Sequence, residues 1–506
     1  MLVQFSEAQR IKLQYCLAGV LLALLAGGIY YPTLVSCYGL QDDYSYLWVV
    51  TFEHWHYFDL IGAMGRPLYQ LLSQQVFALA DSICDLNNIR AFTLLTAWGL
   101  ALQCYWMARR YDWSATMAFV LAAAWLSAPA IGLIVAWAVT FPYLFALSLS
   151  LLAGELVWQA VARSRFRAGW RLFVAAVLLF TSLLVYQHAA MGYWLVVALV
   201  CFSPRGFRWP GWPALLLWIG FFISLLLIYY LFYRIYLQHL IVADSMNLHA
   251  AERASITTDI LAKLRFLYES LQLTLSIGQF RLWPVLTYVV SAVISAALLR
   301  EAWRQRSVWP VLGALALVVA VYLPSLLVVE SLLKVRLLIV LGLLVLFGLL
   351  WALQVLLPRH QWHSVVGLVL IAYLAISEHI AIQRLVELNQ AEARAVQTAL
   401  QEHYSAASNQ IAIVRPVPAN WDGGASWLIE YGTPTMATWA DFARVLVQQL
   451  FAETFKTQRL PDVLQCPEAN RSDCATLQEQ PALPVLDLGH LLREQLAPDW
   501  SKTVSD

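Results

Sequence analysis

The stretch CLAGVLLALLAGGIYYP, residues 16–32, decides the fold class of this chain. It belongs to an apolar run of about 20 residues, the length that an α-helix needs to cross the hydrocarbon core of a bilayer. The start of the chain has the look of a signal peptide, but no small-residue cleavage site follows the apolar run cleanly. We therefore expect an uncleaved first membrane helix over residues 13–31.

The whole chain has the composition of an integral membrane protein. Of its 506 residues 61% are hydrophobic and 12% are charged, and the mean hydropathy is +0.65. Soluble domains have about 45–50% apolar and about 25% charged residues. No basic arm or basic, aromatic-interleaved face is evident, so a nucleic-acid partner is not expected.

Eleven segments predict an all-α polytopic membrane protein, because each is apolar over a length that can span. We expect these spans at 13–31, 89–108, 115–135, 139–161, 171–187, 189–203, 213–233, 283–299, 310–328, 337–357 and 364–380.

Basic residues in the short connections fall on one side of this predicted topology. They are Arg10, Lys12, Arg109, Arg110, Arg163, Arg165, Arg167, Arg171, Arg205, Arg208, Arg300, Arg304, Arg306 and Arg359. The positive-inside rule makes that side cytoplasmic. With an odd number of spans, the amino terminus is then inside and the carboxyl terminus outside.

Three segments on the outer side are too long to be simple turns: 32–88, 234–282 and the tail from 381 to 506. We divide the chain into a membrane module, 1–380, and a C-terminal domain, 381–506. The tail contains strand-like runs (QIAIV, SWLIEYG) and an amphipathic helical pattern (WADFARVLVQQLFAETF), which predict a small α/β domain. Irregular or polar chain of this length is compatible with a membrane protein only outside the hydrocarbon or along a cavity.

The cysteines of the outer segments agree with an oxidising compartment. Cys466 and Cys474 bracket the short polar loop CPEANRSDC, which predicts a disulfide, the alternative being two free thiols. Cys37 and Cys84 lie in the first outer segment and could pair as well.

The first outer segment carries the main candidate site. It begins with QDDYSYLWVV, residues 41–50, where Asp42 and Asp43 follow the first span directly. Residues 44–61 and 67–83 have the pattern of two interfacial helices, with Pro67 in the first turn of the second, separated by GAMGRP. A carboxylate at the membrane surface can take a proton from an attacking hydroxyl group. Two adjacent carboxylates can instead share a divalent cation such as Mg²⁺ or Mn²⁺.

Other outer residues are candidate substrate contacts. Aromatic side chains near the acidic pair, Tyr44 and Trp48, suit a sugar ring or a prenyl chain. Arg66 can clamp a phosphate bidentately, or contact a lipid headgroup. Further candidates are Lys334, Arg336 and Arg234 for a donor phosphate, and Glu330, Tyr186, Gln187 and His188 for the substrate. Snorkelling cations and helix-capping polar groups are the structural alternatives.

An acidic pair after the first span, followed by surface helices and a GRP turn, resembles the GT-C superfamily of polyprenyl-phosphate-sugar-dependent glycosyltransferases. Within that superfamily the likeness is to the GtrII-like O-antigen glucosyltransferases. Weaker similarities are LLVYQHAAMGYW, residues 183–194, and ESLLKVRLL, residues 330–338. The likeness covers the membrane module, roughly residues 10–380, and not the tail.

This resemblance implies an inverting glycosyltransferase on the periplasmic face of the bacterial inner membrane. The donor would be an undecaprenyl-phosphate sugar, and the acceptor a lipid-linked glycan, as in lipopolysaccharide modification, or another surface molecule. Asp42 is the expected general base, with Asp43 as its partner, orienting group or metal ligand, although the two roles can be exchanged. No further cofactor is expected, and a divalent cation is compatible with the reaction but not required.

Three other functions remain open: an O-antigen ligase or polymerase, a pilin or protein glycosyltransferase, and a non-enzymatic flippase of lipid-linked glycans. A ligase would use residues of the 234–282 segment, such as His249, Arg253 and Arg265. A flippase would show charges deep within several spans and internal repeats, which are not evident. No phosphate-binding loop or dinucleotide fingerprint is present, so a nucleotide donor is not expected.

Overall fold

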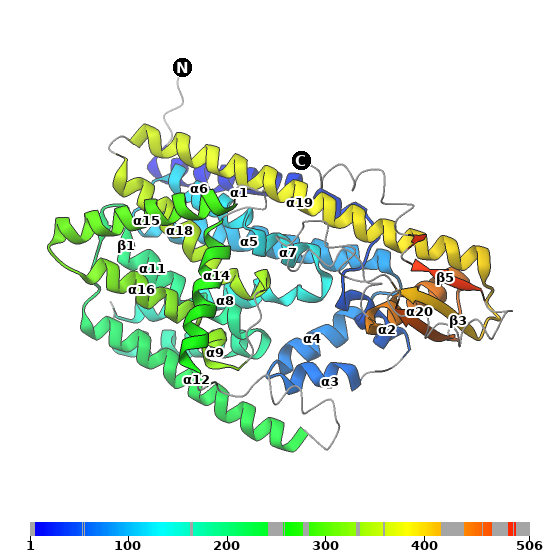
Figure 1. The fold of residues 1–506 in the computed structure, drawn as a ribbon. Coiled ribbons are helices and arrows are strands. Elements are labelled where there is room, and N and C mark those ends of the chain that lie inside the picture. The colour runs from blue at the N-terminus through cyan, green and yellow to red at the C-terminus, as the bar shows by residue number, and fades with distance from the viewer. Residues whose placement is uncertain are drawn as a thin grey trace.

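The computed structural model describes residues 6–52, 54, 56–161, 165–240, 257, 259–276, 283–329, 334–357, 360–415, 440–457, 459–467, 484–488 and 490–491. Long helices make up most of this part of the chain, and a small sheet lies at one end (Figure 1). The long helices are α1 (Glu7–Val35), α5 (Leu86–Arg110), α6 (Ala115–Leu126), α8 (Pro142–Val161), α9 (Arg165–Val185), α12 (Trp212–Leu240), α15 (Trp283–Gln305), α16 (Trp309–Val321), α18 (Ile339–Leu356) and α19 (His360–His403).

Seven helices of the described residues are long and apolar enough to cross a membrane, or eight if a bent pair counts as one span. They lie in α1, α8, α9, α12, α15, α18 and α19, and the bent pair is α6 with α7 (Pro129–Ala136). The chain is therefore a mostly helical, multi-pass membrane protein. The number of eleven spans and the N-in/C-out orientation stay predictions.

Three predicted spans differ from the structure in detail. The 115–135 segment bends by 50° between α6 and α7, because Pro129 begins a new helix. The 310–328 segment is divided at Tyr322 into α16 and a short α17 (Leu323–Leu327), which has Pro324 in its first turn. The 189–203 segment begins in the short helix α10 (Gln187–Ala190) and continues in the nine-residue helix α11 (Tyr193–Cys201). The hairpin of β1 (Phe202–Ser203) and β2 (Gly206–Phe207) follows.

The first outer segment forms three short helices in place of the predicted two. They are α2 (Asp42–Thr51), α3 (His56–Ala63) and α4 (Pro67–Phe77), and a 3₁₀ turn, η1 (Ile83–Asp85), leads into α5. The predicted helix 44–61 is interrupted after Phe52, and the predicted helix 67–83 ends at Phe77. Pro67 occupies the first turn of α4, as predicted.

The tail joins the membrane module through α19, which continues unbroken from His360 to His403. The boundary predicted at residue 380 falls within this helix, so one rigid element belongs to both parts (Figure 1). The predicted strand QIAIV is confirmed as β3 (Gln410–Arg415), and the predicted amphipathic helix as α20 (Ala440–Phe455). Two parallel neighbours, β4 (Asp462–Pro467) and β5 (Val485–Asp487), flank β3. The predicted strand SWLIEYG lies outside the described residues.

Candidate functional site

Asp43 is fully buried at the start of α2, and its carboxylate accepts four hydrogen bonds. The backbone amides of Leu40 and Val139 donate at 3.0 and 2.9 Å, and the amide of Ala138 at 3.4 Å. Arg90 Nη2 on α5 completes the set at 3.1 Å and forms a buried ion pair. Burial raises the pKa of Asp43, while Arg90 and the backbone amides oppose that shift. The Asp43 carboxylate is therefore fully engaged in hydrogen bonds within the protein.

Arg90 connects α2 with two other segments of the chain. Its Nε donates to the Ala136 carbonyl at 3.0 Å, its Nη1 to Asn87 Oδ1 at 3.1 Å and its Nη2 to the Tyr38 carbonyl at 2.8 Å. Its guanidinium carbon also lies 3.7 Å from the centroid of the Tyr38 ring. A planar guanidinium with five N–H donors suits such a junction, which the single ammonium of Lys could not satisfy.

The break between α7 and α8 makes further contacts with Arg90, Asp43 and their neighbours. Ala136 accepts from both Tyr38 and Arg90, Val139 accepts from Tyr69 Oη at 2.8 Å, and two amides of the break bind Asp43. Trp137 lies within the same break, with the guanidinium carbon of Arg336 4.5 Å from its ring centroid. One short segment thus connects the acidic pair with the basic turn near residue 336.

Asp42 has different surroundings from its neighbour, because it is half-buried and lies within reach of the charges of this basic turn. Among the described residues, no hydrogen bond to the Asp42 carboxylate is found. Burial raises the pKa of Asp42, and the positive charges of Arg336 and Lys334 oppose that shift. Gln41, the residue before it, has φ +44° and ψ −112°, a sparsely populated backbone conformation of the kind that collects at functional sites.

Arg66 lies in the predicted GRP turn, directly before α4. Its Nε donates to Gln187 Oε1 at 3.3 Å, and its guanidinium carbon lies 5.0 Å from the centroid of the Tyr186 ring. Gln187 Nε2 in turn donates to the Gly65 carbonyl at 3.0 Å. The charge of Arg336 also acts on Arg66, so Arg336 lies within electrostatic reach of both Asp42 and Arg66.

Gly65 gives the GRP turn its shape. Its φ of +81° is a conformation that glycine adopts readily and other residues rarely do. A Cβ added there would lie 2.5 Å from Tyr229 Oη and 2.9 Å from the Tyr233 ring, so no larger residue fits without movement. Tyr229 Oη donates to the Gly65 carbonyl at 2.8 Å. These contacts hold Arg66 in place.

His188 and a pair of stacked tyrosines lie beside Arg66. The Tyr143 and Tyr186 rings stack with centroids 3.7 Å apart and planes within 6°. His188 Nε2 lies 2.9 Å from Ser325 Oγ on α17, and its buried Nδ1 has no hydrogen-bond partner in the described part of the chain. Burial and the charges of Arg66 and Arg336 lower the pKa of His188 and keep the ring neutral.

Several predicted site residues lie elsewhere. Tyr44 is fully buried next to Gly39, and Trp48 stacks on His54 with ring centroids 4.6 Å apart. Arg234 is exposed on α12 and is not among the charges that act on Asp42. Arg265 is exposed and pairs with Glu269 on α14 (Ile260–Leu275). Glu330, His249 and Arg253 lie outside the described residues.

The surroundings of the acidic pair do not suit a divalent cation. Hydrogen-bond donors already occupy the Asp43 oxygens, and Asp42 faces two positive charges. In the described ranges, no group of three or more His, Cys, Asp or Glu residues is placed to hold a metal ion. The proposed chemistry of this region therefore uses side chains and not a metal ion.

An apolar cavity of about 560 Å³ lies along α4. Its walls come from α4, α5 and the start of α8, and include Leu72, Val76, Phe92, Phe141 and Phe145. Asp85 and Asn88 are its polar lining residues. Tyr69, which contacts the α7–α8 break, is one helical turn before Leu72 on α4. The cavity therefore lies beside the polar cluster and has the chemistry of a site for a hydrocarbon chain.

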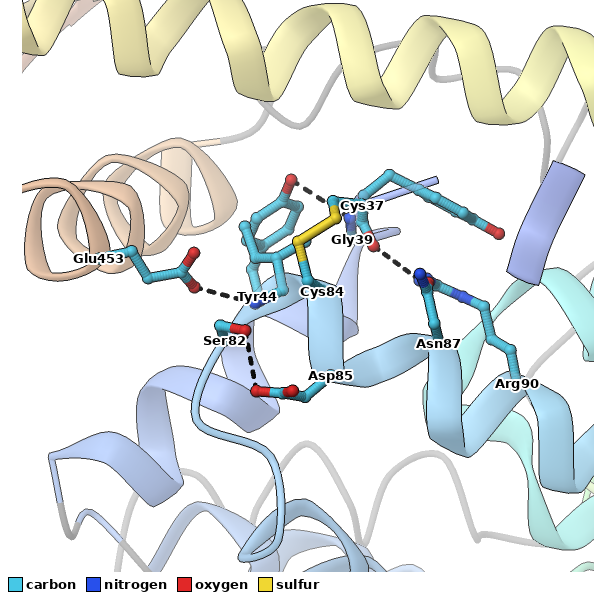
Figure 2. Close-up of a disulfide and its surroundings, with 11 residues drawn as sticks. Cys37, Gly39, Tyr44, Ser82, Cys84, Asp85, Asn87, Arg90 and Glu453 are labelled. Carbon is cyan, nitrogen blue, oxygen red and sulfur yellow. Dashed lines mark hydrogen bonds between the residues drawn. A yellow bond between two sulfur atoms is a disulfide. The ribbon is translucent and has the colours of Figure 1, made fainter. Parts of the chain in front are cut away.

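Cys37 and Cys84 form a disulfide that joins the segment after α1 to η1, as Figure 2 shows. The pairing considered for them from the sequence is confirmed. Cys466 is also disulfide-bonded, and its predicted partner Cys474 lies outside the described residues.

Two residues of the site were not predicted: Arg90 and Trp137. The available signal for Arg90 was an arginine in LNNIRAF, near the outer end of an apolar helix, and it has the pattern of an ordinary snorkelling cation. No sequence feature distinguished Trp137 from the other tryptophans of the chain.

No model of a known protein family, no curated protein and no solved structure matches this chain.

Proposed function

We propose that the chain is an inverting glycosyltransferase that takes a sugar from a polyprenyl-phosphate donor on the outer surface of the membrane. One observation carries the proposal: Asp42 is a half-buried carboxylate without a hydrogen bond from the described residues, and the positive charges of Arg336 and Lys334 act on it. Arg336 also acts on a third cation, Arg66. An available base next to clustered cations fits a reaction that removes a proton and releases a phosphate.

The proposed reaction needs only groups of this cluster and the two substrates. The acceptor hydroxyl oxygen attacks the anomeric carbon, and Asp42 takes the hydroxyl proton. The bond between the anomeric carbon and the phosphate oxygen breaks, and its electron pair leaves with the polyprenyl phosphate. Lys334 and Arg336 stabilise the negative charge that develops on that phosphate, and Arg66 binds the phosphate as well.

One further feature supports a lipid-linked sugar. The apolar cavity along α4 can accept part of a hydrocarbon chain whose phosphate lies at the cluster. The bacterial inner membrane, the periplasmic orientation and a glycan acceptor form part of this proposal through the family resemblance of the sequence.

Transfer of radiolabelled sugar from a polyprenyl-phosphate donor, measured in membranes that contain the full chain, tests this proposal. Asp42→Asn should lower the transfer rate by about 10² to 10⁴, since a general base contributes about that much. Asp59→Asn is the matched control, because Asp59 is an exposed carboxylate on α3 that accepts from Gln70. Full transfer by the Asp42→Asn protein would refute the role of Asp42.

A further inference from the structure

The C-terminal domain contacts the helix that carries Asp42. In Figure 1, α20 lies next to α2, and residues of the two helices pack together. Tyr44, two residues after Asp42, is fully buried on the side of α2 where the charges of Glu392 and Glu453 act on it. Asp42 faces the basic turn instead. Helix α2 therefore lies between the tail domain and the candidate site.

One hydrogen bond from the tail domain reaches the loop that ends the first outer segment. Glu453 on α20 lies close to the Cys37–Cys84 disulfide (Figure 2). Its Oε1 accepts from the backbone amide of Ile83 at 3.0 Å and from Gln449 Nε2 at 2.9 Å. Ile83 is the first residue of η1 and is 4% exposed. Its amide has no acceptor within its own helix turn, because the first amides of a helix never do. Glu453 thus supplies an acceptor to a buried amide.

The loop around Ile83 is connected to the site by two routes. The first route is the disulfide: Cys84 follows Ile83, and its bond to Cys37 fixes the segment before α2, which contains Tyr38 and Leu40. The second route is η1, which leads directly into α5. Arg90 near the start of α5 binds both the Tyr38 carbonyl and Asp43. Both routes end at the first turn of α2, where Asp42 begins the helix.

We propose that Glu453 is a positioning residue for the transfer reaction: by accepting the hydrogen bond from Ile83, it lets the C-terminal domain fix the start of α5 and, through Arg90 and Asp43, the place of Asp42. This inference rests on the proposed function for its effect on the rate. The effect of Glu453 on the reduction rate of the disulfide can be measured without any substrate.

Two variants of nearly equal size isolate the hydrogen bond. Glu453→Gln removes the charge and keeps the acceptor oxygen, whereas Glu453→Met removes both. Glu402→Gln on the exposed end of α19 is the control for a charge change in the same domain. All variants are made in the full chain, and their recovery as folded protein is checked by size-exclusion chromatography.

The first measurement is the rate at which dithiothreitol reduces the Cys37–Cys84 disulfide, followed by alkylation and mass spectrometry of the Cys84 peptide. We expect Glu453→Met to speed reduction by about fivefold or more, and Glu453→Gln to stay within twofold of the unsubstituted chain. Equal rates for the Met and Gln variants would overturn the proposal. A Met variant that fails to fold while the Gln variant folds would assign the bond to folding and overturn the positioning role.

The second measurement separates kcat from KM in the transfer assay. We expect Glu453→Met to lower kcat about tenfold with KM for the donor within twofold, because Lys334 and Arg336 remain in place, and Glu453→Gln to restore kcat. A rise in KM with unchanged kcat would overturn the proposal. If the unsubstituted chain transfers no sugar from any polyprenyl donor, the proposed function fails, and the reduction rates alone still decide whether Glu453 holds the outer loop.

Discussion

Arg90 Nη2 lies 3.1 Å from Asp43 Oδ2, and neither side chain is exposed to solvent. This ion pair gives the two adjacent carboxylates different environments. Asp43 is enclosed by donors, whereas Asp42 is half-buried beside Arg336 and Lys334. In our proposal Asp43 is therefore the anchor of α2, and Asp42 is the group that meets the substrate.

Replacement of Arg90 by Met should destabilise the protein by about 3–5 kcal/mol, because it leaves the Asp43 carboxylate buried without its counter-ion. Thermal unfolding in detergent measures this loss. Arg90→Lys should recover only part of it, since one ammonium cannot reach the four acceptors that Arg90 serves. Arg265→Met is the control, because Arg265 is exposed and its pair with Glu269 should contribute less than about 1 kcal/mol.

The pH dependence of transfer should report the environment of Asp42. Burial raises the pKa of Asp42, so the proton-accepting form is lost at a higher pH than for an exposed aspartate, whose pKa is about 3.9. The pH at which kcat/KM falls on acidification should therefore be higher than for an exposed aspartate base. Arg336 lowers the pKa of Asp42, so Arg336→Gln should raise that pKa further and move this fall in kcat/KM to still higher pH.

Lys334→Gln should move the fall in kcat/KM in the same direction by a smaller amount, since Lys334 is the weaker of the two influences. A fall at unchanged pH in Arg336→Gln, measured on the residual activity, would count against Asp42 as the titrating base.

The sequence correctly predicted a mostly helical, multi-pass membrane protein, because its apolar segments are long enough to span. The predicted topology puts Asp42, Arg66, Lys334 and Arg336 on one side of the membrane, and that orientation stays a prediction. In the structure, the charges of Arg336 and Lys334 act on Asp42, and Arg336 also acts on Arg66.

The sequence did not distinguish Asp42 from Asp43. Successive residues of a helix point about 100° apart, so the role of each depends on how the first turn of α2 is rotated. That rotation is set by Arg90, by amides of the α7–α8 break and by the tail domain, all distant along the chain. Tyr44 and Trp48 were misplaced for the same reason, because they point to other sides of α2.

Loss of the Cys37–Cys84 disulfide should destabilise the outer segment strongly. The bridge joins residues 47 positions apart, and the chain-entropy estimate for that loop is about 4 kcal/mol. A Cys37→Ser, Cys84→Ser double variant should unfold at a lower temperature and lose transfer activity. Cys104→Ser is the comparison, since Cys104 is a free cysteine buried in α5. Equal thermal stability with and without the bridge would contradict this prediction.

Filling the apolar cavity should affect donors with long chains and spare short ones. Leu72→Trp places an indole in the cavity, so KM for a long polyprenyl-phosphate sugar should rise about tenfold, while KM for a two-isoprene analogue should stay within twofold. Leu71→Trp is the control, because Leu71 is 52% exposed on the same helix and does not line the cavity. Equal effects on both donors would place the prenyl chain elsewhere.

Gly65→Ala should impair donor binding through Arg66. The substitution is strained by the φ of +81° and brings a methyl group within 2.5 Å of Tyr229 Oη, so the GRP turn must shift. Because Arg66 is proposed to bind the donor phosphate, KM for the donor should rise about tenfold or more. Gly99→Ala on α5 is the control, since nothing lies within 4 Å of a Cβ there and alanine stabilises a helix interior by about 0.5–1 kcal/mol.

Adding Tyr229→Phe to Gly65→Ala should restore donor binding in part. The double variant removes the hydroxyl group that meets the new methyl, but it leaves the backbone strain and loses the Tyr229 hydrogen bonds to Gly65 and Gln187. Tyr229→Phe alone should raise KM only modestly, because Gln187 still donates to the Gly65 carbonyl. If the double variant binds donor no better than Gly65→Ala alone, the steric contact with Tyr229 is not what displaces Arg66.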